Sequence, residues 1–154
     1  MKLPFRPIIV PGVGFGDIKF GNRVTEVVSL LRLPTEQYSD EDGDLIVECD
    51  AVGVILLSFS REESFRLVSY ELDKRSQAEL WNLRIFTVSL SQMMHTAKMR
   101  GLRLEHVESP RENESDETLY RIKAQSLDFY YLDQQLTAVS AGVIFHDPET
   151  ILWP

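Results

Sequence analysis

Hydrophobic residues recur at helical spacing once in each half of the chain. In the first half they fall at i, i+3, i+4 and i+7, at Val24, Val27, Val28 and Leu31. In the second half the same spacing occurs at Leu90, Met93, Met94 and Ala97. Each set places its apolar side chains on one face, which predicts two short amphipathic helices.

Residues that favour helix ends flank both of these predicted helices. Asn22 is the expected N-cap of the first helix, because its side-chain oxygen can accept from exposed backbone N–H groups. Pro34 ends that helix. Ser89 and Gln92 match a capping box at the start of the second helix, and Gly101 is expected at its C-terminal end.

Alternating and β-rich runs follow each predicted helix. The first half is expected to form a strand at 45–51 and a hairpin of 53–60 and 65–72. The second half is expected to form a strand at 119–124 and a hairpin of 127–132 and 136–141. Further short strands are expected at 15–20 and 83–86, acidic loops at 39–44 and 105–117, and a flexible lead-in at the glycines of 12–16.

The same order of elements in both halves predicts an internal duplication. We expect an α+β fold made of two diverged copies of a helix plus antiparallel β-hairpin unit, with the helices packed on one face of an antiparallel sheet. Residues 1–154 would form a single globular domain whose repeats cover about 15–75 and 80–145.

Composition and charge indicate which classes of macromolecule this protein could bind. The 154 residues include 44% hydrophobic and 26% charged residues, which is typical of a globular domain, and the formal net charge is −8. Nucleic-acid binding is disfavoured because it needs a basic face. The negative net charge would suit binding to a basic protein partner. A negative charge that serves only the solubility of the protein is the alternative explanation.

The N-terminal segment and the single cysteine indicate a cytoplasmic protein. Prolines interrupt residues 1–11, whose longest apolar run is Ile8 to Val10, so that a signal peptide is not expected. Nor does any run approach the length of a membrane span. Cys49 lies on the apolar side of an alternating stretch and is expected to be a small buried residue.

No pattern of catalytic or metal-binding residues was found in the sequence. His95, His106 and His146 do not stand at metal-ligand spacing, and no serine lies in a nucleophile elbow. The carboxylate clusters at 40–44 and 112–117 do not follow the calcium-loop template. We therefore predict no catalytic residue, no metal and no cofactor.

Apolar residues on the outward side of the expected sheet are the candidate binding site. If Val54 and Leu56 face the helix, the alternation turns the next residues outward. The candidate partner-binding residues are Ile55, Leu57, Phe59, Arg121, Lys123, Asp128, Tyr130 and Leu132. Such a face fits protein binding, packing against another part of the same chain, or homodimerisation, and a shift of one residue in register would exchange the two faces.

Residues 16–34 also resemble a recurring bacterial signature. Ile18, Phe20 and Gly21 fit a strand end that leads into a short helix, and Pro34 fits its closing segment, whereas Arg32 stands where the pattern usually has glycine. The stretch is similar to the opening of the β-lactamase-inhibitor-protein-like unit and of the related outer-membrane-assembly lipoprotein unit. This resemblance implies two tandem units whose joined sheets grip a target protein without enzymatic activity.

The resulting hypothesis is a non-enzymatic inhibitor or immunity-type protein that acts by surface contact. The absence of a signal peptide and of a lipoprotein cysteine favours a cytosolic role within that resemblance. One alternative is a small-molecule binder or minor enzyme with a pocket between the halves, using Tyr120, Tyr131 or His95. A second alternative is a structural homodimer.

Overall fold

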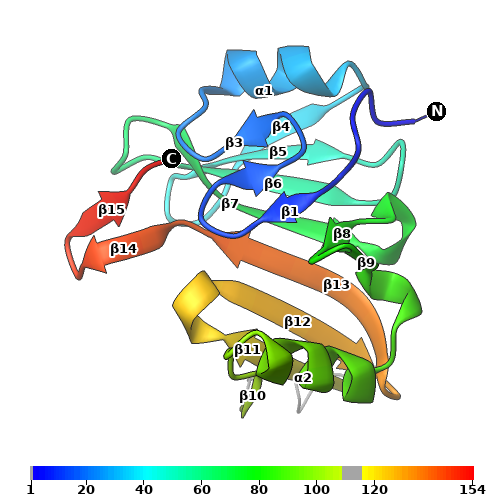
Figure 1. Cartoon of the computed structure of the whole chain (residues 1–154). Helices are drawn as coiled ribbons and strands as arrows, with labels where there is room; N and C mark the ends of the chain where they lie inside the picture. The colour runs from blue at the N-terminus through cyan, green and yellow to red at the C-terminus, as the bar shows by residue number, and fades with distance from the viewer. Residues whose placement is uncertain (1, 109–115) are drawn as a thin grey trace.

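A single large sheet dominates the computed structural model, which describes residues 2–108 and 116–154. The sheet is antiparallel throughout and has eight strands in the order β10-β11-β12-β13-β7-β6-β5-β4 (Figure 1). The strands are β4 (Glu36–Ser39), β5 (Leu45–Cys49), β6 (Ile55–Ser60), β7 (Arg66–Asp73), β10 (Glu105–Val107), β11 (Glu117–Ile122), β12 (Leu127–Leu132) and β13 (Gln135–Gly142).

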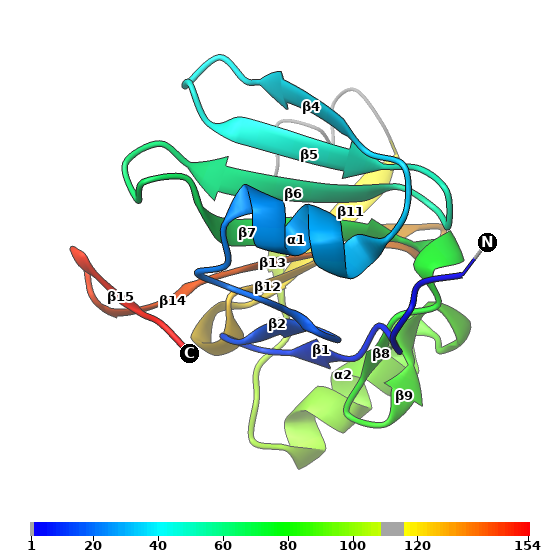
Figure 2. The ribbon, with the colours of Figure 1, turned by 90° about the horizontal axis from the view of Figure 1, so that it is seen from above.

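Smaller elements cover one face of this sheet, here called the inner face (Figures 1 and 2). They include the helices α1 (Val24–Leu31) and α2 (Leu90–Met99) and the short strands β1 (Ile9–Val10), β2 (Gly14–Phe15), β3 (Ile18–Lys19), β8 (Glu79–Leu80) and β9 (Leu83–Arg84). Three 3-10 turns, η1 (Lys74–Ser76), η2 (Ile85–Thr87) and η4 (Lys123–Gln125), and the terminal hairpin of β14 (Ile144–Asp147) and β15 (Thr150–Leu152) complete the described elements. The opposite face of the large sheet is called the outer face below.

The core lies between the inner face and these covering elements. Alternate residues of the central strands are buried, as in β12, where Leu127, Phe129 and Tyr131 are enclosed. From the covering layer, α1 contributes Val27 and Leu31, and Phe15 of β2 joins the same cluster. Burial of this apolar surface is the main force that fixes the register of the sheet.

Local sequence sets the ends of both helices. At α2 the predicted capping box is confirmed, because Gln92 N donates to Ser89 Oγ at 3.2 Å and Ser89 N donates to Gln92 Oε1 at 3.1 Å. At α1 the predicted N-cap is wrong: Arg23 occupies that position, and its backbone N–H donates to Glu26 Oε1 at 2.9 Å. Asn22 instead accepts from the backbone N–H of Lys19.

The two helices also end differently. Gly101 follows α2 with a φ of 72°, as expected for glycine after a helix. Arg32 caps α1 with a φ of 52°, in the left-handed region that favours glycine. This is the position at which the resembling bacterial signature usually has glycine.

The predicted fold class is wrong, because the structure is mainly β and not two helix-plus-hairpin units. Its regular α-helices within the described residues have only 8 and 10 residues, whereas the large sheet takes four strands from each half of the chain. The missed edge strands β4 and β10 are mostly polar and exposed, so that hydrophobic periodicity does not reveal them. Neither two-residue strands nor 3-10 turns leave a periodic signal that could be detected.

The glycine-rich segment is also different from the expected flexible lead-in. It follows β1 and contains β2, in which both Gly14 and Phe15 are buried. The Tyr70 hydroxyl donates to the carbonyl oxygen of Gly14 at 2.9 Å. The predicted acidic loop at 105–117 contains β10 at its start, while residues 109–115 lie outside the described part of the chain.

Candidate functional site

The strand register lines up one outward side chain from each of the eight strands. Each pair in this line is directly opposed across two neighbouring strands, and directly opposed residues share a face of the sheet. In order across the sheet, the line consists of Glu36, Glu48, Leu56, Glu71, Ser140, Asp128, Arg121 and Glu105. We call this line the cross-strand row.

The row concentrates negative charge on the outer face. It contains five carboxylates and one guanidinium, a net charge of −4 in a chain whose formal net charge is −8. Its members come from residues 36 to 140, so the chain must fold before these charges are neighbours. Closely spaced charges of one sign produce a field that attracts a basic partner and repels an acidic one.

At the β10–β11 end of the row, the charges are paired. Arg121 Nε lies 2.6 Å from Asp128 Oδ1, and Arg121 Nη2 lies 3.0 Å from Asp128 Oδ2, which is a bidentate arrangement. The hydrogen bond to Asp128 raises the pKa of Arg121. Glu105, opposite Arg121, also lies 3.3 Å from Arg103 Nη1.

At the β4–β5 end, like charges face each other. Glu36 and Glu48 are directly opposed, and neither forms an ion pair with any residue that the structure describes. Directly opposed like charges destabilise an antiparallel pair. This end of the row therefore keeps an unfavourable interaction that a cation from another molecule would relieve.

Aromatic and apolar side chains flank the row. Next to the Glu36–Glu48 pair, Tyr38 and Ile46 are directly opposed, and the Tyr38 side chain is 45% exposed. In the second half, Tyr130 and Leu119 are opposed in the same way. Tyrosine beside charge is typical of protein-binding surfaces, because the ring adds contact area with little loss of entropy.

A small hollow lies beside the row near the junction of the two halves. Its volume is about 300 Å³, and its lining includes Ser69, Ser126, Ser140, Arg121 and Asp128. Lys123 also lines it, so the hollow holds two cations beside one carboxylate, and Arg121 already binds that carboxylate. The outer face thus combines a charged row, the exposed ring of Tyr38, the partly buried ring of Tyr130 and a polar hollow.

The structure separates the predicted site residues into two groups. Arg121, Asp128, Tyr130 and Leu132 lie on the outer face, and Leu132 is 39% exposed. Lys123 is exposed in η4.

The outward placement of Ile55, Leu57 and Phe59 is wrong, since all three are fully buried at 0% exposure. Cys49 pairs directly with Ile55, so both side chains point to the inner face. The chain turns between Cys49 and Ile55, and the alternation of inward and outward residues in β6 is shifted by one residue from the expected one. This shift exchanges the two faces of β6.

Sequence reasoning missed most of the cross-strand row. Glu36, Glu48, Glu71, Ser140 and Glu105 were not among the candidates. The alternation of charged and apolar residues in 45–49 could have indicated that Glu48 points outward. Its alignment with residues of other strands depends on the register and has no local signal.

The residues of the proposed inter-half pocket do not line a common cavity with His95. His95 is exposed on α2, while Tyr131 is 1% exposed and packs edge-on against Tyr120 at a centroid distance of 5.7 Å. The ring of His106 lies near Tyr120 in a tilted arrangement, with the two ring centroids 5.6 Å apart. Within residues 2–108 and 116–154, no group of three or more acidic, histidine or cysteine side chains is arranged to hold a metal ion.

Cys49 is buried and unpaired, as predicted. Among the described helices, none is long and apolar enough to cross a membrane. Comparisons with protein-family models, with curated proteins and with solved structures found no match to this chain.

Proposed function

We propose that this protein binds a basic partner protein through the outer face of its sheet and acts without turnover, as an inhibitor or immunity-type protein. The observation that carries the proposal is the directly opposed, unpaired pair of Glu36 and Glu48 at the end of an acidic row. The resemblance of residues 16–34 to the inhibitor-type unit favours the same class of function.

The energetic argument rests on what remains unsatisfied in the free protein. A lysine or arginine placed between Glu36 and Glu48 would turn a repulsion into two attractions. The exposed ring of Tyr38 beside this pair offers apolar contact to the stem of the same basic side chain. Long-range attraction by the whole row would raise the association rate, and added salt would lower it.

The same charges disfavour a homodimer stacked through the outer faces. A second copy would bring its own carboxylate row against this one, and like charges across an interface cost affinity. A pocket between the halves lacks support as well, because Tyr131 is enclosed and His95 points to solvent. The cytoplasmic location remains a prediction that fractionation of native cells tests.

A pull-down from native cells, with three immobilised versions of the protein, tests the proposal. These are the wild type, Glu36→Lys with Glu48→Lys, and a control with Asp17→Lys and Glu149→Lys. The control changes the net charge equally at exposed positions in the β2–β3 and β14–β15 turns. We expect a protein with a basic surface to be retained by the wild type and the control, and to be lost from the Glu36/Glu48 variant.

Salt and stoichiometry complete the test. Retention should fall as NaCl rises from about 0.05 M to about 0.5 M, over which the screening length shortens several-fold. The purified pair should form a one-to-one complex. Equal retention by the Glu36/Glu48 variant, or a partner with an acidic surface, would contradict the proposal.

A further inference from the structure

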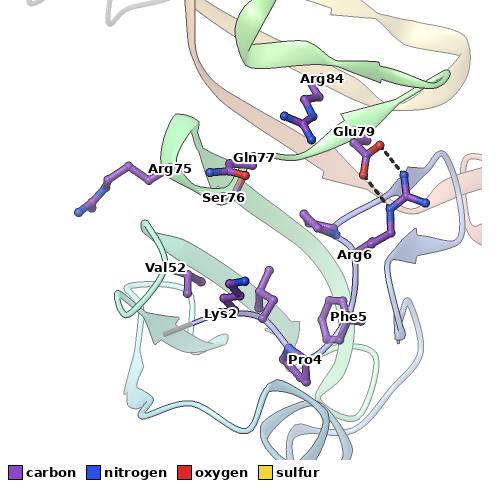
Figure 3. A pocket seen from close by; sticks show the side chains of 12 residues that line it. Lys2, Pro4, Phe5, Arg6, Val52, Arg75, Ser76, Gln77, Glu79 and Arg84 are labelled. Atoms are coloured by element: carbon purple, nitrogen blue, oxygen red, sulfur yellow. Dashed lines mark hydrogen bonds and ion pairs between the residues drawn. The ribbon is translucent and has the colours of Figure 1, made fainter.

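A second hollow, of about 560 Å³, lies away from the cross-strand row, between the N-terminal segment and the chain from η1 to β9 (Figure 3). Residues 2–7 form one wall. The opposite wall comes from Ser76, Gln77, Glu79 and Arg84, and Val52 lies at the side. Its volume falls within the range of small-molecule sites.

The N-terminal wall is held in place by specific contacts. Arg6 binds Glu79 through two hydrogen bonds, Nη2–Oε1 at 2.7 Å and Nε–Oε2 at 3.2 Å. The backbone N–H of Glu79 donates to the carbonyl oxygen of Pro7 at 3.0 Å. Phe5 packs on Phe15, with ring centroids 5.9 Å apart.

This hollow collects positive charge in an acidic protein. Lys2, Arg6, Arg75 and Arg84 line it, with Glu79 as the carboxylate among its lining residues. The Arg6–Glu79 pair is neutral as a unit. In Figure 3 the Arg75 side chain extends away from the other lining residues, and it pairs with Asp50 at 3.1 Å and Asp73 at 3.4 Å.

Two cations are left without a counter-charge. Neither Lys2 nor Arg84 forms an ion pair with the residues that the structure describes, and they belong to opposite walls. Together they leave two uncompensated positive charges at the hollow. A phosphate monoester carries about −1.5 to −2 at pH 7, which matches this charge.

A buried hydroxyl gives an independent indication of a polar ligand. Ser76 is 5% exposed and, apart from two tyrosines and Cys49, is the only buried residue with a polar side chain in the described part of the chain. Its Oγ accepts from the backbone N–H of Ala78 at 3.3 Å, and no described residue accepts its own proton. Ser76 lines the hollow, so that an oxygen of a bound anion could take this proton.

Apolar side chains complete the lining. Phe5 and Leu3 belong to the N-terminal wall, with Val52 beside them. A bare phosphate ion would leave this apolar surface in contact with water. An organic group attached to the phosphate would cover it and add affinity.

We propose that this hollow binds a small organic phosphate. Arg84 and Lys2 pair with the phosphoryl oxygens, the Ser76 hydroxyl donates to one of them, and Phe5 contacts the organic group. This site is separate from the partner-binding face, and its test does not depend on the proposed function.

Isothermal titration calorimetry of the full chain with three probes tests the assignment. The probes are phenyl phosphate, inorganic phosphate and benzoate. We expect phenyl phosphate to bind more tightly than both, because it alone combines the dianion with the apolar ring. Arg84→Gln should weaken its binding about ten- to a hundredfold, as loss of a charge-assisted hydrogen bond does.

The matched control is Lys98→Gln, which removes one positive charge from the exposed surface of α2 and should leave the affinity unchanged. Lys2→Gln, in the exposed N-terminal segment, provides a second test if Arg84→Gln is poorly folded. Absence of phenyl phosphate binding at millimolar concentration would overturn the proposal. So would unchanged affinity in both pocket variants, or benzoate binding as tightly as phenyl phosphate.

Discussion

The two ends of the cross-strand row occupy equivalent places in the sheet but carry opposite charge arrangements. Glu36 and Glu105 lie on the two edge strands, and Glu48 and Arg121 lie on the strands next to them. At one end a glutamate opposes a glutamate. At the other end a glutamate opposes an arginine.

The difference lies in whether the charges of the row are paired within the molecule. The arginine end is satisfied within the molecule, since Arg121 also holds Asp128 in a bidentate pair. At the glutamate end, the repulsion between Glu36 and Glu48 remains in the free protein, and a bound cation would relieve it. Opposite charges at both ends would be the more stable arrangement, and under the proposed function the glutamate pair is kept for binding.

The largest expected effect concerns which face of β6 is buried. Leu57→Ala removes a fully buried side chain from the inner face and should lower the free energy of unfolding by about 3 kcal/mol. Leu132→Ala, on the outer face of β12, should lower it by less than about 1 kcal/mol. Urea unfolding of both variants measures the difference, and similar losses would mean that the faces are assigned incorrectly.

Reversing the charge at the satisfied end should make it resemble the other end. Arg121→Glu loses the bidentate pair and places like charges opposite both Asp128 and Glu105. Because the pair is partly exposed, with 43% and 23% side-chain exposure, we expect a loss of about 1–2 kcal/mol.

Thermal unfolding compares this variant with a charge-swapped double variant, Arg121→Glu with Asp128→Arg. The double variant should recover part of the loss, because it restores opposite charges across β11 and β12. No recovery would show that the loss comes from packing and not from charge.

Two buried tyrosines, one in each half of the chain, differ in the hydrogen bonding of their hydroxyl groups. The Tyr70 hydroxyl donates to the carbonyl oxygen of Gly14, whereas the Tyr131 hydroxyl is buried and has no hydrogen-bond partner among the residues that the structure describes. Tyr70→Phe should therefore cost about 1 kcal/mol, and Tyr131→Phe should be neutral or stabilise by up to about 1 kcal/mol. Equal losses in denaturant unfolding would show that the Tyr131 hydroxyl has a partner in solution.

The same tyrosines predict the alkaline behaviour of the protein. Burial raises the pKa of both Tyr70 and Tyr131. Above about pH 10 the unfolded chain ionises these phenols while the folded chain keeps them neutral, so stability falls as the pH rises further. Either Phe variant should show a smaller alkaline loss than the wild type.

The smallest effect on stability is expected at the Glu36–Glu48 end of the row, where a substitution should stabilise the protein and not destabilise it as most mutations do. Glu48→Lys turns the Glu36–Glu48 repulsion into an attraction and should stabilise the free protein by about 0.2–1 kcal/mol. The same variant should bind the partner less tightly. Destabilisation in thermal unfolding, or unchanged binding, would remove the argument that this pair is kept for function.

Local signals in the sequence were sufficient for some elements and insufficient for others. The capping box of Ser89 and Gln92 was predictable because both partners lie within one helical turn. The hairpins of β6 with β7 and β12 with β13 follow from β-rich runs around short turns. The edge strands β4 and β10 were missed because their polar, exposed residues form strands only by pairing with a neighbour.

The candidate site was predicted in part for a similar reason. The outward positions of Asp128, Tyr130 and Leu132 were predictable because β12 keeps a regular alternation, and Arg121 of β11 lies directly opposite Asp128. Ile55, Leu57 and Phe59 were assigned to the wrong face because the turn before β6 changes the phase by one residue. Neither the row nor the hollow beside the N-terminal segment has a sequence signature, since each combines residues from distant parts of the chain.

The sequence by itself determined the negative charge, the positions of the two helices, the burial of Cys49 and the hairpin turns. These features depend on composition or on residues a few positions apart. Tertiary structure alone decided which glutamates face each other and which cations share a hollow. The physical reason is that burial of the apolar side chains on the inner face sets the order and register of the strands. The neighbours of an outward side chain therefore depend on the inward side chains of the same strands.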